Sequence, residues 1–181
     1  MENNLIIKLN VLTKIINETK WFSNVGNDFS KNQNQLILKY AMFFDKRIEI
    51  RKIENWEEAI KLLNSDSWSK KFWNKEEDER IKLYNTITKK YSDIILSKHL
   101  GKFTNDLSNI IGKSNFKKLN IKDENYGYYS RVAIGSAASC CHQAALALIA
   151  NQKNHFFTIK FEIFKFGFWP LIISNDELNI F

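Results

Sequence analysis

The sequence predicts a mostly helical single domain that spans residues 1–181, with five to seven helices and a small C-terminal β-hairpin. The 181 residues include only 6 Gly and 1 Pro, and a β-sandwich or barrel usually needs many more of both for its turns. Apolar residues also recur at spacings of three and four along most of the chain, which is the period of an amphipathic helix. The length and the hydrophobic fraction of 44% suit one globular domain with a sizeable core.

The N-terminal part of the chain is predicted to form two helices joined by a polar linker. Apolar residues from Leu5 to Phe22 lie on one helical face, and Gly26 is expected to stop this first helix. Residues 27–34 are polar and form the linker. A second helix is predicted within 35–53, although its end, Arg47–Ile53, alternates between polar and apolar residues and suits a short strand equally well.

A short helix and the start of a longer one are expected next. Asn55 suits the cap of a helix over Trp56–Leu63, because it precedes a first turn whose acids favour the positive end of the helix dipole. Ser65–Ser67 then restarts a helix. The core residues of that new helix are expected to be Trp68, Phe72 and Trp73.

An amphipathic helix is the strongest pattern in the middle of the chain. Its apolar residues run from Ile81 to Ile95 at helical spacing, and Gly101 is expected to end it. Phe103–Gly112 forms a further short helix, and 113–125 is predicted to be a polar loop.

The C-terminal part begins with an alanine-rich segment that is apolar nearly all round. We expect 132–150 to form the most buried helix, since such a helix cannot face water on any side. The pattern of 155–166 fits a strand as well as a helix. A hairpin is predicted at the end of the chain, with its tight turn at Asn175-Asp176, because Asn and Asp tolerate positive φ.

Composition places the protein in the cytoplasm of its cell. The chain starts with an acid rather than the basic residues of a signal peptide, and no uninterrupted apolar run of membrane-spanning length occurs. Cys140 and Cys141 are neighbours, which gives no disulfide framework. We therefore expect a reduced, cytoplasmic protein that has no membrane partner.

The net charge of +7 comes mostly from lysines that are spread along the chain. Specific nucleic-acid contacts favour arginine, of which there are few. Charge alone therefore indicates no nucleic-acid partner, but a lysine-rich nucleic-acid-binding helical module stays open as the alternative function.

No catalytic, cofactor-binding or metal-ligating residues are predicted. The three histidines show no metal-ligand spacing, and the glycines are isolated rather than gathered in a phosphate loop. Cys140, Cys141 and His142 offer the best nucleophile, but neighbouring positions on a helix point away from each other. Buried thiols on a packed helix are the favoured interpretation, and an enzyme that uses them is the weakest hypothesis.

The chain also carries three ordered segments that are rich in tryptophan and phenylalanine. The first is Trp21–Gly26, and the second runs from Asn55 to Trp68 and continues into 80–91. The third joins a small-residue helix to Phe156-Phe157, Gly167–Pro170 and a hairpin that closes on Ile180-Phe181. In content and order, the chain resembles the immunity proteins of contact-dependent growth inhibition and related polymorphic toxin systems.

This resemblance implies a protein without an active site that binds the C-terminal toxin domain of its cognate toxin and neutralises it by occlusion. It also favours a helix over 155–166. Tight and fast association needs aromatic anchors and electrostatic steering, which come together in one stretch of this sequence. The predicted toxin-binding residues are accordingly Trp68, Trp73, Glu76, Glu77, Asp78 and Glu79.

Overall fold

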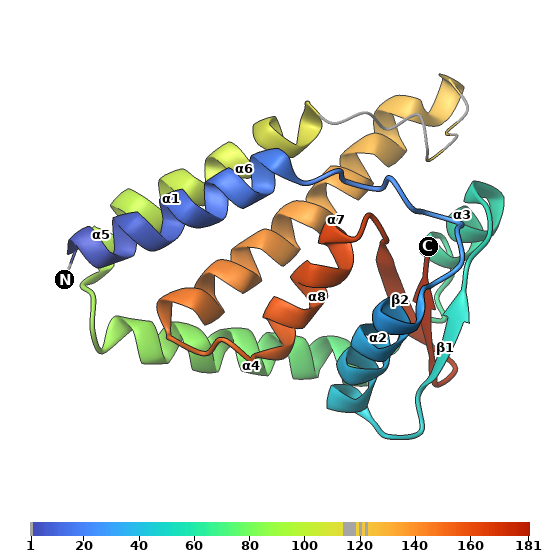
Figure 1. The fold of residues 1–181 in the computed structure, drawn as a ribbon, viewed down its shortest axis with the longest axis horizontal. Helices are drawn as coiled ribbons and strands as arrows, with labels where there is room; N and C mark the ends of the chain where they lie inside the picture. Colours follow the sequence, from blue (N-terminus) through green and yellow to red (C-terminus); the bar gives the residue numbers. More distant parts are fainter. Residues whose placement is uncertain (1, 114–118, 120, 122) are drawn as a thin grey trace.

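A computed structural model of the chain describes residues 2–113, 119, 121 and 123–181, and shows a helical domain with a small sheet at one end (Figure 1). The helices are α1 (Glu2–Glu18), α2 (Lys31–Phe44), α3 (Trp56–Leu63), α4 (Lys70–Thr88), α5 (Asp93–Leu96), the π-helix η1 (Ser97–Gly101), α6 (Lys102–Gly112), α7 (Asp123–Ile149) and α8 (Phe156–Lys165). The strands are β1 (Glu49–Lys52), β2 (Pro170–Ser174) and β3 (Glu177–Ile180). Because α5, η1 and α6 follow one another without a break, the described residues form seven continuous helices. The predicted fold class is confirmed.

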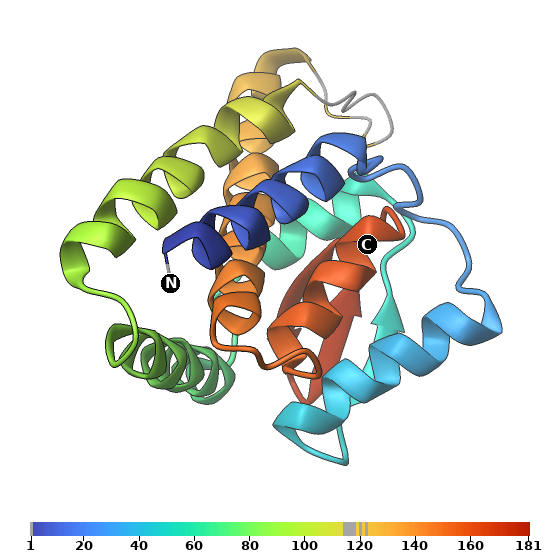
Figure 2. The ribbon, with the colours of Figure 1, turned by 60° about the vertical axis from the view of Figure 1, so that its left-hand side comes forward.

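Helix α7 is the centre of the domain, and it crosses the middle of the molecule in both ribbon views (Figures 1 and 2). It packs against α1, α4, α6 and α8. Small buried residues such as Ala133, Ala137 and Ala145 allow this close approach on several sides at once. The predicted burial of 132–150 agrees with this packing. The predicted loop 113–125 lies largely outside the described residues, and α7 already begins at Asp123.

Part of α7, Tyr126–Ile149, is long and apolar enough to cross a membrane by length and composition alone. In this fold, 56% of the most apolar window of that segment is buried inside the domain. The sequence analysis expects no membrane span here, because polar residues interrupt this apolar stretch.

The sheet has three strands in the order β1-β3-β2. The predicted hairpin is confirmed: β2 and β3 are antiparallel, and Asn175 and Asp176 adopt φ values of 50° and 60° in its turn. The ambiguous stretch 47–53 is resolved as strand β1. This strand pairs in parallel with β3, with Glu49 opposite Glu177, an arrangement that no local pattern in the sequence indicates.

The end of the first helix differs from the sequence prediction. The first helix ends at Glu18 rather than at Gly26, and Trp21 and Phe22 lie in the turns that follow it. Phe22 has φ of 59°, which no helix tolerates, and both aromatic side chains are buried against the core. Tertiary packing of these rings therefore overrides the helical spacing.

The amphipathic pattern over 81–95 belongs to two helices rather than one. Helix α4 ends at Thr88, and Ser92 starts the next helix by accepting a hydrogen bond from the amide of Ile95. Gly101 does not end a helix, because it closes the π-helical turn that leads directly into α6. The N-cap at Ser92 is the local signal that the spacing analysis missed.

Candidate functional site

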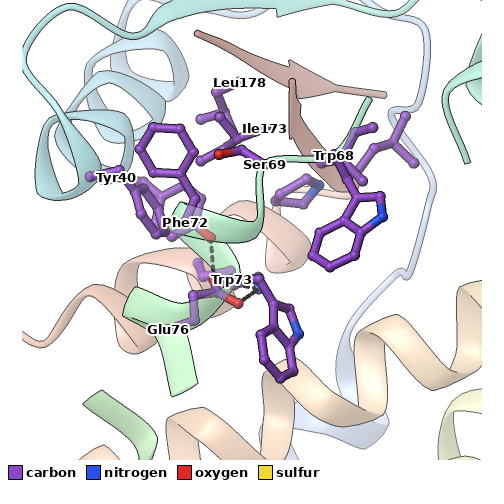
Figure 3. A pocket seen from close by; sticks show the side chains of 13 residues that line it. Tyr40, Trp68, Ser69, Phe72, Trp73, Glu76, Ile173 and Leu178 are labelled. Atoms are coloured by element: carbon purple, nitrogen blue, oxygen red, sulfur yellow. Dashed lines mark hydrogen bonds and ion pairs between the residues drawn. The ribbon is translucent and has the colours of Figure 1, made fainter. Parts of the chain in front are cut away.

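A pocket of about 130 Å³ opens where the start of α4 meets the C-terminal sheet and helices α2 and α8 (Figure 3). Its walls are mostly apolar, and one charged pair lies among them. The lining residues are Tyr40, Phe44, Trp68, Ser69, Phe72, Trp73, Glu76, Lys160, Pro170, Leu171, Ile172, Ile173 and Leu178. Three of the six predicted toxin-binding residues, Trp68, Trp73 and Glu76, therefore share one pocket.

The two tryptophans of the pocket are largely open to solvent. Trp68 is 47% exposed and Trp73 is 56% exposed, whereas both were expected in the core. Trp68 lies before α4 rather than within it, because its backbone bridges to Ser174 at the edge of β2. Phe72 alone of the three predicted core residues is buried. Large aromatic side chains left exposed beside a pocket are typical of a binding surface.

The sheet holds this segment in place. The amide of Ser69 donates a hydrogen bond of 2.8 Å to the carbonyl of Ile173, and α4 starts at the next residue. The start of α4 is thus fastened to strand β2, so Trp68 and Trp73 project from a rigid frame rather than from a free loop.

Glu76 forms the polar part of the pocket together with Tyr40 and Lys160. Its Oε1 atom accepts hydrogen bonds of 2.8 Å from the Tyr40 hydroxyl and 2.8 Å from Lys160 Nζ, and its Oε2 atom lies 3.1 Å from the same Nζ. Both charged side chains are mostly buried, with exposures of 18% and 15%. Burial acts to lower the pKa of Lys160, but the charge of Glu76 outweighs it and the pKa is raised. Burial and the same carboxylate raise the pKa of Tyr40.

The remaining acids of the predicted site are mostly neutralised by cations of the chain itself. Glu77 pairs with Arg80 at 2.5 Å, and Glu79 pairs with Lys82 at 2.6 Å. Glu79 also accepts a hydrogen bond of 3.4 Å from the ring of His155, whose pKa is lowered by burial. Among the described residues Asp78 has no such cation, and it is exposed. The acidic run is therefore a much weaker source of steering than its sequence indicates, because only Asp78 presents an uncompensated charge to solvent.

The candidate nucleophiles lie elsewhere, in the middle of α7. Cys140 and Cys141 are fully buried, and burial raises the pKa of both thiols, that of Cys140 to about 12. A reactive cysteine needs a depressed pKa and access to solvent, and neither thiol has them. No group of three or more candidate metal ligands occurs in the part of the chain that the structure describes.

His142 is fixed by Thr104 rather than by either cysteine. The Thr104 hydroxyl donates to the carbonyl of Leu100 at 2.8 Å, so its contact of 2.9 Å with Nδ1 of His142 requires the ring to donate there. Burial, together with the charge of Arg80, lowers the pKa of His142. The ring is thus held neutral against α6.

Sequence reasoning missed Tyr40, Lys160 and the β2 residues of the pocket. Lys160 is 84 positions away from Glu76 along the chain, and no local pattern links the two. Within α8, the position of Lys160 between Phe157 and Phe161 was the available signal, since a lone lysine on an aromatic helix face needs a buried acid.

Comparison with protein-family models, with curated proteins and with solved structures finds no match to this chain. The resemblance to immunity proteins accordingly stays a prediction.

Proposed function

We propose that this protein is a cytoplasmic immunity protein that binds the toxin domain of a cognate secreted toxin and neutralises it by occlusion. The observation that carries the proposal is the exposed pair Trp68 and Trp73 at the mouth of a preformed pocket. Tryptophan is among the residues that contribute most to protein-protein binding, especially around a pocket at the interface centre. The ordered aromatic segments of the sequence support the same function.

The rigidity of the site supports tight binding. Ordering side chains and loops at an interface costs free energy, and a surface that is already ordered avoids much of that cost. The backbone hydrogen bond from Ser69 to Ile173 and the burial of the Phe72 side chain fix this surface before any partner arrives. A protein whose task is to capture a toxin before it acts benefits directly from such preorganisation.

Co-expression tests the proposal. The toxin domain encoded beside this protein should kill cells that lack it and spare cells that produce it. The double variant Trp68→Ala/Trp73→Ala should lose protection while keeping the parent's circular dichroism spectrum. The matched control is Tyr128→Ala/Ile94→Ala, which removes two exposed apolar side chains from elsewhere on the surface. Equal killing with and without the protein would refute the immunity function.

The alternative function is that of a lysine-rich nucleic-acid-binding module, and one observation favours it. Lys8 lies near Lys90 and Lys153. Its pKa is lowered mainly by burial and in second place by the charges of these two lysines. The ammonium group of Lys8 already donates to carbonyls at the end of α7, so phosphate contact through this cluster would fall to Lys90 and Lys153, and such binding would weaken steeply with salt. Fluorescence anisotropy with single-stranded RNA and duplex DNA distinguishes the two functions. It is measured at 50 and 200 mM salt, because several phosphate contacts lose orders of magnitude in affinity over this range.

A further inference from the structure

We infer that the pocket between Trp68 and Trp73 receives the ring of one tyrosine side chain of the toxin, whose phenolic hydroxyl donates a hydrogen bond to Glu76. The inference rests on the proposed function and names the group by which the partner would be anchored. Three properties of the pocket carry it: its size, the unused acceptor capacity of the carboxylate, and the charge balance beside that carboxylate.

The size of the pocket suits a single six-membered ring. Its volume is about 130 Å³, and a cavity of about 150 Å³ lined by apolar residues is known to hold one benzene molecule. Phe72, Leu171 and Ile173 supply the apolar walls. A phenol ring fits this space.

The carboxylate of Glu76 keeps capacity for one more donor. A carboxylate offers about four acceptor positions, and the described residues fill Oε1 with Tyr40 and Lys160 and leave Oε2 with one contact of 3.1 Å to Lys160. A group that enters the pocket displaces water from Glu76, which is 18% exposed. An entering group without a donor would leave that acceptor position unpaired, and a buried unpaired acceptor is costly.

The charge balance favours a neutral donor. Lys160 already compensates Glu76 inside the pocket, so a lysine or arginine of the partner would bring a second, uncompensated cation into a desolvated site. A carboxylate would meet Glu76 itself. Tyrosine combines a six-membered ring with an uncharged donor.

The exposed tryptophans complete the site. Trp68 and Trp73 line the pocket and project beside its opening (Figure 3). Aromatic rings attract each other in offset or edge-to-face geometry, so the two indoles can hold the entering ring from the sides. They also exclude water from the hydrogen bond to Glu76.

Small ring compounds test this inference without any toxin, so its failure is separate from a failure of the immunity function. The probes are p-cresol, the side chain of tyrosine; toluene, which lacks the hydroxyl; and benzylamine, which is cationic. Binding is followed through the indole N–H signals of the ¹⁵N-labelled protein. The buried Trp21, Trp56 and Trp169 serve as internal references, and single substitutions assign Trp68 and Trp73.

We expect p-cresol to shift the signals of Trp68 and Trp73, and toluene to bind more weakly by about tenfold or more, which corresponds to one hydrogen bond to a charged group. Benzylamine should bind more weakly than p-cresol. Leu171→Phe, which fills the pocket, should abolish these shifts and leave Glu76 intact. The variant Tyr40→Phe/Glu76→Leu/Lys160→Met, in which the polar groups become apolar, should bind toluene at least as well as p-cresol.

Any one of several results would overturn the inference. They are equal binding of toluene and p-cresol to the parent protein, stronger binding of benzylamine, and shifts that persist in full in Leu171→Phe. An absence of any shift at Trp68 and Trp73 with p-cresol at saturation of its solubility would also overturn it. Since the Leu171→Phe comparison keeps all polar groups of the pocket, it decides the matter even if the triple variant does not fold.

Discussion

The Nζ atom of Lys8 in α1 lies 2.8 Å from the carbonyl oxygen of Leu148 in the last turn of α7 and 3.3 Å from that of Ile149. The ammonium group thus donates to carbonyls in the last turn of α7, where that of Leu148 also accepts from the amide of Asn151 at 3.2 Å, and it lies at the negative end of the helix dipole. Two helices far apart in the sequence are joined through one side chain at the end of the central helix.

Lys8→Met should therefore destabilise the protein by about 1–2 kcal/mol, since it removes charge-assisted hydrogen bonds at a helix C-terminus. Urea unfolding followed by circular dichroism measures the change. Lys14→Met is the matched control, because Lys14 lies on the same helix and is exposed. A similar loss in both variants would show that the capping contact contributes nothing of its own.

Two glycine substitutions should act in opposite directions. Gly167 has φ of +84°, and an added Cβ would lie 2.8 Å from the amide nitrogen of Asn24 and closer still to Ser23 Oγ. Gly167→Ala should cost about 1–3 kcal/mol or more. Gly135 lies inside α7 with open space around its Cβ position, so Gly135→Ala should raise stability by up to about 1 kcal/mol through helix propensity. Thermal melts of both variants check the pair, and a stabilised Gly167→Ala would contradict the close approach.

Overpacking of the central helix gives a third prediction. Ala145 is completely buried, whereas Ala138 is only partly buried. Ala145→Phe should destabilise the domain by about 1–3 kcal/mol or more, because the packed helices around it must move apart. Ala138→Phe should cost less. Differential scanning calorimetry ranks the two, and an unchanged melting temperature for Ala145→Phe would place this residue outside the core.

Stability should fall in mildly acidic solution. Burial lowers the pKa of His142 and of His155 below the ordinary value of 6.5, although Glu79 opposes this shift at His155. Between the folded and the unfolded pKa the unfolded chain binds more protons, so this contribution to stability is complete above about pH 6.5 and decreases as the pH falls below it. Chemical unfolding from pH 8 to pH 5 measures the slope (a range that spans the ordinary histidine pKa).

The variants His142→Gln and His155→Asn should each flatten that pH dependence. Asn is a good cap, so it replaces the side-chain acceptor that His155 offers to the amide of Phe157 at the start of α8. An unchanged slope in the double variant would assign the acid sensitivity to other groups.

The acidic run predicts a kinetic effect on toxin binding that follows from the immunity proposal. Asp78 is exposed, whereas Glu77 and Glu79 pair with cations of the chain. Asp78→Lys should slow association and reduce its sensitivity to salt with little change in dissociation, because exposed charges act mainly on the encounter rate. Stopped-flow fluorescence measures this. Equal association rates for Asp78→Lys and the parent would place the steering charges elsewhere.

Local patterns in the sequence were sufficient for most of the helices and for the hairpin. The stretch after His155 is the exception, because its own pattern fits a strand as well and only the resemblance favours the helix α8. The turn at Asn175-Asp176 depends on neighbouring residues, and the structure has it. The same holds for the cap at Asn55, whose side chain accepts a hydrogen bond from the amide of Glu58. Propensity, capping and turn chemistry act over a few residues, which is why one sequence can reveal them.

The features that sequence reasoning missed depend on residues far apart in the chain. The pairing of Glu76 with Lys160 closes a loop of 84 positions, and the exposure of Trp68 depends on its backbone bridge to Ser174. Periodicity indicates that a side chain is apolar and lies on a helix face. It cannot indicate which strand will occupy the neighbouring space, so a tryptophan that looks like core can end at the surface.

The parallel pairing of β1 with β3 has a consequence for protein synthesis. Glu49 emerges from the ribosome long before Glu177, its partner in the sheet. Until the last strand is made, the first one has no neighbour, and the frame that fastens the start of α4 to β2 is also absent. The central helix α7 and its neighbour α8 are also made late, and the surface that presents Trp68 and Trp73 is completed only after translation has passed the hairpin.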